Sequence, residues 1–154
     1  MNDAYFIAAQ AGVCPLATGI PGAAKTALVY EFARSLEREC YAFIGSIREP
    51  SDMGIPFQSA EADYYNLSPP KWAHLMSLDP GKWILFLDEL TTCPPATQAA
   101  MLRVVAERHV GDLPLGDDVI VCAACKPSCW ALRMNRLAIA TMLVGMWVSI
   151  ALPY

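Results

Sequence analysis

Charged residues are scarce in this chain. They make up 17% of its 154 residues, the formal net charge is −4 and the sequence pI is near 5.0. A surface that binds nucleic acid needs an excess of positive charge, so we expect no nucleic-acid partner. The N-terminus, Met1-Asn2-Asp3, also lacks the basic region and the apolar segment of a secretory signal peptide. We therefore expect a cytoplasmic protein.

Histidine is scarcer still, and the two that are present, His74 and His109, have no visible metal partner in the sequence. Cysteine is less rare, and Cys122, Cys125 and Cys129 form a C-x2-C-x3-C run. However, Cys122 falls inside an apolar stretch, and a fourth ligand at metal-site spacing is missing. We expect reduced cysteines and no metal site in this run.

Apolar stretches of strand length alternate with helical patterns over residues 1–127. The length suits one domain, and no internal repeat or low-complexity segment is present. Such alternation is typical of a parallel α/β sheet with right-handed crossovers. We expect helices at 4–11, 24–38, 70–78 and about 91–108, strands at 13–18, 41–46, 83–89 and 119–124, a small hairpin at 110–116, and a surface loop or irregular insertion at 48–66.

A glycine-rich segment lies between the first strand and the first long helix. Its sequence, GIPGAAKT (19–26), matches the phosphate-binding pattern G-x-x-x-x-G-K-[ST] except at Ala24, where the pattern has glycine. In such loops, backbone N–H groups form an anion-binding nest at the positive end of the following helix. Lys25 would contact the outer phosphates, and the Thr26 hydroxyl would be a ligand of Mg²⁺. The alternative is a Gly/Pro turn that only joins a strand to a helix.

A second motif favours the nucleotide interpretation. The apolar run 83–87 is followed directly by Asp88 and Glu89, which indicates a buried parallel strand with carboxylates at its C-terminal end. Ligands of open α/β sheets bind outside the carboxyl ends of the strands. Asp88 is the predicted second Mg²⁺ ligand, and Glu89 is the predicted catalytic residue that orients or deprotonates the attacking water. The two motifs together predict a P-loop NTPase core.

The chain resembles the MoxR-type AAA+ ATPases, in the helix-2-insert branch of that superfamily, over residues 16–127. Alanine often precedes the lysine in the phosphate-binding loop of this family. The other similar segments are SIREPSD (46–52), LSPPKWA (67–73), LFLDEL (85–90) and QAAMLRVVAER (98–108). The resemblance implies ATP and Mg²⁺ as cofactors and a ring, usually hexameric, that remodels or matures partner proteins. It also implies a von Willebrand A-type partner protein.

The chain departs from this family at the end of the strand 119–124. The family has an asparagine there that helps to position the attacking water, whereas this sequence reads Ala124-Cys125-Lys126-Pro127. Lys126 has no acceptor atom, so it can contact a γ-phosphate but cannot orient water as an amide does. We therefore expect slow turnover. The family's helical lid is also not expected, because the resemblance stops at Pro127.

The tail has an unusual composition, and we expect a division between a core at 1–127 and an atypical apolar tail at 128–154. Residues 137–152 carry no charge and follow Arg133 and Arg136. Three interpretations stay open: a short membrane anchor, a helix or strand packed on the sheet, or out-of-frame or truncated sequence. A sixteen-residue helix would span only about 24 Å of a core about 30 Å thick, which is short for an anchor.

The expected fold is therefore an α/β, three-layer P-loop NTPase sandwich with a mostly parallel sheet and no C-terminal helical lid. The expected function is ATP binding with weak Mg²⁺-dependent hydrolysis in a chaperone-like remodelling ATPase core. The alternatives are a truncated, catalytically impaired nucleotide-binding module and a tail-anchored form. The candidate residues are Glu89 for catalysis, Thr26 and Asp88 for the metal, and, for the nucleotide, Gly19, Pro21, Gly22, Ala23, Ala24, Lys25, Thr26 and Lys126.

Overall fold

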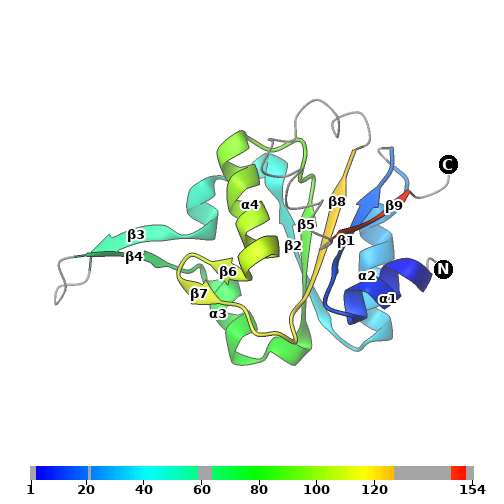
Figure 1. Cartoon of the computed structure of the whole chain (residues 1–154), viewed down its shortest axis with the longest axis horizontal. Helices are drawn as coiled ribbons and strands as arrows, with labels where there is room; N and C mark the ends of the chain where they lie inside the picture. Colours follow the sequence, from blue (N-terminus) through cyan, green and yellow to red (C-terminus); the bar gives the residue numbers. More distant parts are fainter. Residues whose placement is uncertain (1–2, 21, 59–63, 127–146, 152–154) are drawn as a thin grey trace.

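A five-stranded parallel sheet forms the centre of the protein (Figure 1). A computed structural model describes residues 3–20, 22–58, 64–126 and 147–151. The strand order is β2-β5-β8-β1-β9. The expected alternation of strands and helices is therefore confirmed, with strand bounds β1 Cys14–Thr18, β2 Glu39–Ile44, β5 Trp83–Asp88, β8 Ile120–Cys125 and β9 Trp147–Ala151.

Helices cover both faces of this sheet and complete three layers (Figure 1). Helices α1 and α2 pack on one face, and α3 and α4 pack on the other. Their bounds are α1 Asp3–Gln10, α2 Lys25–Ser35, α3 Lys71–Leu78 and α4 Pro95–Glu107. Short 3₁₀ turns occur at Gly45–Ile47, Pro50–Met53 and Pro80–Lys82, and the expected small hairpin consists of β6 His109–Val110 and β7 Leu113–Pro114. The fold is thus an α/β sandwich in which each helix buries one apolar face.

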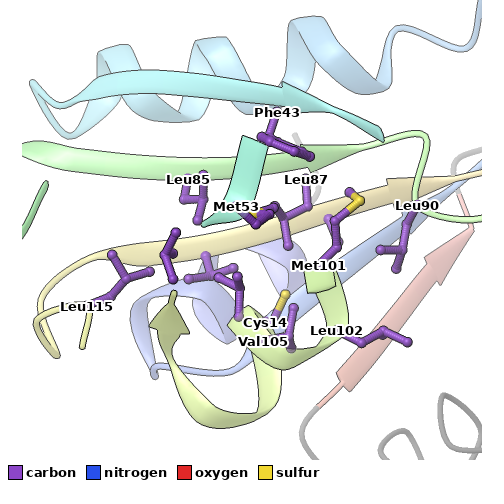
Figure 2. Close-up of a cluster of buried hydrophobic side chains, with 14 of the residues drawn as sticks. Cys14, Phe43, Met53, Leu85, Leu87, Leu90, Met101, Leu102, Val105 and Leu115 are labelled. Carbon is purple, nitrogen blue, oxygen red and sulfur yellow. The ribbon is translucent and has the colours of Figure 1, made fainter. Parts of the chain in front are cut away.

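Alternate residues of the central strands supply two separate hydrophobic cores. In β5, Leu85 and Leu87 pack beneath α3 and α4, whereas Ile84 and Phe86 pack beneath α1 and α2. All four side chains are fully buried, as expected for a parallel strand covered on both faces. Figure 2 shows Leu85 and Leu87 pointing into the same cluster as Met101 of α4. The uninterrupted apolar run in the sequence reflects this two-sided burial.

The expectation of a loop over residues 48–66 is wrong in part. This segment contains the first of two strands, β3 Ile55–Gln58 and β4 Tyr65–Ser68, that pair in an antiparallel hairpin and project from the body of the molecule (Figure 1). The N–H group of Asp112 donates a hydrogen bond of 3.1 Å to the carbonyl of Leu67, which joins the hairpin to the β6–β7 turn. Most residues of both strands are exposed, so no buried face produces the alternating pattern that would predict a strand.

Part of the tail joins the sheet. Residues Trp147–Ala151 form β9, which pairs in parallel with β1 over the register Cys14↔Trp147 to Thr18↔Ala151. β9 is thus an edge strand of the sheet, beside β1, and the three interpretations of the tail as a whole stay open. Residues 127–146 lie outside the described part of the chain, and so does the proposed domain boundary at 127. None of the helices in the described part of the chain has the length and apolar composition of a membrane span.

Candidate functional site

The two sequence motifs meet at the carboxyl ends of the parallel strands. β1 leads into the glycine-rich loop and α2, while β5 and β8 are neighbours that end at Asp88 and Cys125. A cavity of about 320 Å³ lies at this edge, which is within the size range of small-molecule sites. It is lined by Gly22, Ala23, Ala24, Lys25, Thr26, Asp88, Glu89, Cys125 and Lys126.

The glycine-rich loop turns through two residues in the left-handed region. Gly22 has φ of 84° and Ala24 has φ of 53°. Ala24 is also the N-cap residue of α2, and no side chain among the described residues caps this helix. The first N–H groups of α2 therefore remain available at the positive end of the helix dipole, beside the cavity. Such an arrangement is suited to an anionic group.

Lys25 and Thr26 start this helix and face different partners. The Lys25 ammonium donates hydrogen bonds to the carbonyls of Gly19 at 2.8 Å and Ile20 at 2.9 Å. The Thr26 hydroxyl donates to Oδ2 of Asp88 at 3.1 Å, which connects two motifs separated by 62 residues. A hydroxyl and a carboxylate are hard oxygen ligands of the kind that Mg²⁺ prefers, so the two residues fit this ion. Bound there, Mg²⁺ would neutralise phosphate charge.

Glu89 does not belong to the strand as predicted, because β5 ends at Asp88. Glu89 has φ of 56° and lies in a turn. Its N–H donates to Oδ1 of Asp88 at 2.8 Å, and its carbonyl accepts from the N–H of Thr92 at 3.0 Å. The next residue, Leu90, donates its N–H to the carbonyl of Ala124 at 3.1 Å and accepts from the amide of Gln98 at 2.9 Å. These bonds hold an unfavourable backbone conformation in place at the edge of the cavity.

The Glu89 carboxylate lies between two side-chain donors. Lys126 Nζ is 3.2 Å from Glu89 Oε1, and the side chains are 33% and 30% exposed respectively. A hydrogen bond from the Ser46 side chain lowers the pKa of Glu89 most strongly, and the ammonium groups of Lys126 and Lys25 also lower this pKa. Partial burial of Glu89 acts in the opposite direction. The carboxylate is therefore held in its ionised form.

The structure gathers most of the predicted site residues in one place. Glu89 and seven other predicted residues line the cavity. Gly19 contacts the site through its carbonyl, which accepts a hydrogen bond from Lys25. Pro21 lies outside the described residues. Sequence reasoning missed Ser46 as a neighbour of Glu89 and Cys125 as part of the lining. The available signal was positional: Ser46 follows β2, whose carboxyl end lies beside that of β5.

The cysteine run does not gather around an ion in the part of the chain that is described. Cys122 packs in the cluster beneath α1 and α2, whereas Cys125 packs in the cluster beneath α3 and α4. Their side chains leave β8 on opposite faces, so they cannot ligate one ion together. Cys129 lies outside the described residues.

Comparison with solved structures identifies the class of this fold. The chain superposes on a candidate ATPase from Cytophaga hutchinsonii with a TM-score of 0.65 and 22% identity over 99% of its length. It is also similar to the Holliday junction branch migration motor RuvB of Thermotoga maritima (TM-score 0.55, 16% identity, 94% of this chain) and to NtrX of Brucella abortus (0.61, 15%, 98%). The chain spans 45%, 40% and 35% of the length of these proteins respectively. Neither the protein-family models nor the sequences of curated proteins match it.

The likeness shows that the chain has the three-layer α/β P-loop fold of these solved structures.

Proposed function

We propose that this chain binds Mg²⁺-ATP and hydrolyses it slowly at the cavity between α2 and the ends of β5 and β8. One observation carries the proposal: Thr26 contacts Asp88 at 3.1 Å, beside Lys25 at the uncapped start of α2. If the glycine-rich segment were only a turn between a strand and a helix, this contact with the Asp88 carboxylate of the second motif would not be expected. The resemblance of both motifs to phosphate-binding and metal-binding segments agrees with this role.

Each residue has a distinct role in this proposal. The N–H groups at the uncapped start of α2 and the Lys25 ammonium bind phosphates, and Thr26 and Asp88 hold Mg²⁺. Glu89 accepts the proton of the attacking water or orients that water. Lys126 contributes a second positive charge to the same cavity. Catalysis then comes from positioning and electrostatic stabilisation of the transferred phosphoryl group.

The first test is nucleotide binding by isothermal titration calorimetry. Lys25→Ala is expected to weaken Mg²⁺-ATP binding by roughly 10- to 100-fold, because it removes a charge-assisted contact with phosphate. Lys71→Ala is the matched control, since Lys71 is an exposed lysine of α3 away from the cavity. Equal affinities of the Lys25→Ala and Lys71→Ala variants would contradict the proposal.

The second test is phosphate release. Glu89→Gln is expected to retain binding and to lose turnover by about 10²–10⁴-fold, the usual contribution of a general base. A second candidate function is a nucleotide-binding module without turnover, and the ion pair between Glu89 and Lys126 favours it. Binding by the parent chain with no phosphate release that depends on Glu89 would select this module.

The finer assignment rests on the resemblance to the MoxR-type group. We infer from it a chaperone-like ATPase that forms a ring and acts with a von Willebrand A-type partner protein. Sedimentation velocity with and without Mg²⁺-ATP tests the ring. A chain that stays monomeric at all concentrations with nucleotide bound would exclude ring formation by this chain alone.

A further inference from the structure

The ion pair between Lys126 and Glu89 joins two groups that both face the cavity. Their charged atoms are 3.2 Å apart, and each side chain is about one-third exposed. The pair is thus accessible to a ligand in the cavity and is not locked by surrounding protein. Lys126 follows β8 directly and Glu89 follows β5, so the pairing depends on these strands being neighbours in the sheet.

The pairing affects what Glu89 can do. A general base needs a carboxylate lone pair directed at water, but the Lys126 ammonium lies 3.2 Å from Oε1 of this carboxylate. While Lys126 remains there, one oxygen is engaged by a cation. Release of this cation would free Oε1 of Glu89 to accept a hydrogen bond from water.

A terminal phosphate is a stronger acceptor for Lys126 than a single carboxylate. Among the side chains that line the cavity, Lys25 and Lys126 are balanced by Asp88 and Glu89. A triphosphate adds several negative charges beside them, and a lysine ammonium on a flexible stem can change partners at little cost. Lys25, at the start of α2, is the other cation near the incoming phosphates.

We propose that Lys126 is a positioning residue that leaves Glu89 for the terminal phosphate of bound ATP, so that the base is released by ATP and not by ADP. This inference rests on the proposed function, because it requires nucleotide in the cavity. It makes Lys126 a nucleotide-dependent restraint on Glu89 and a source of preference for ATP.

A double-mutant cycle on nucleotide affinity tests this transfer. The full chain and its Glu89→Gln, Lys126→Gln and doubly substituted forms are titrated with Mg²⁺ and either a non-hydrolysable ATP analogue or ADP. If Lys126 leaves Glu89, binding of the analogue breaks the pair. Glu89→Gln should then tighten binding of the analogue in the parent chain more than it does in the Lys126→Gln chain. The two effects should differ by a factor of about 1.5 to 5, which corresponds to the energy of an exposed ion pair. With ADP, Glu89→Gln should change affinity by the same factor in both backgrounds.

Each other outcome has a definite meaning. Equal effects of Glu89→Gln in both backgrounds with the ATP analogue would overturn the transfer, and so would the same coupling with ADP. Failure of all four proteins to bind either nucleotide, with normal circular dichroism and unfolding temperature, would overturn the proposed function itself. Both side chains are partly exposed, so the amide substitutions leave the two buried cores untouched.

Discussion

Replacing Ala24 by glycine is expected to stabilise the protein. Ala24 is exposed and has φ of 53° and ψ of 22°, the left-handed conformation that an L-residue adopts at a cost of roughly 1–2 kcal/mol. Glycine has no Cβ and avoids this cost, but it makes the unfolded chain more flexible, which opposes the gain by about 0.4–1 kcal/mol. The net expectation is a gain of about 0.5–1 kcal/mol in the free energy of unfolding.

The same substitution at Ala99 is the matched control. Ala99 is also exposed, but it lies inside α4 in the right-handed helical conformation. Glycine there is expected to cost about 1 kcal/mol, because it loses helix propensity and gains no relief of strain. The two Ala→Gly variants should therefore differ by roughly 1.5–2 kcal/mol, with opposite signs.

Urea denaturation followed by circular dichroism measures both variants. In thermal unfolding, a gain of about 1 kcal/mol in the free energy of unfolding would raise Tm by about 2–4 °C for a chain of this size. Ala24→Gly also keeps the backbone N–H of the loop, so its affinity for Mg²⁺-ATP should match that of the parent chain. A loss of stability in Ala24→Gly equal to that in Ala99→Gly would refute the left-handed conformation as the cause.

Two further predictions concern the core and the base of the hairpin, and urea midpoints measure both. Leu85→Ala removes a fully buried side chain and should destabilise the protein by about 2–5 kcal/mol, whereas Leu78→Ala, at a side chain 69% exposed, should change stability by less than about 0.5 kcal/mol. Comparable losses would contradict the buried position of Leu85. Gly111 and Gly12 both have positive φ, but a Cβ at Gly111 would lie 2.6 Å from the carbonyl oxygen of Leu67, while Gly12 faces open space. Gly111→Ala should therefore cost about 1–3 kcal/mol more than Gly12→Ala, and equal losses would exclude that close contact.

Much of the fold could be predicted because its strands are buried on both faces. The apolar run 83–87 leaves few alternatives to a central parallel strand, and the carboxylates after it mark the end of that strand. The hairpin of β3 and β4 could not be predicted in this way. Its strands pair with each other and remain mostly exposed, so their formation depends on a register that leaves no hydrophobic pattern in the sequence.

The sequence by itself predicted the proposed phosphate-binding groups, because the loop residues from Gly19 to Thr26 are contiguous. It also indicated Asp88 and Glu89 as carboxylates at the end of a strand. Only the tertiary structure decided that Lys126 pairs with Glu89 and that Ser46 lowers the pKa of this carboxylate. These contacts join the ends of three different strands, β2, β5 and β8, and the order of strands in a sheet is set by packing across the whole chain.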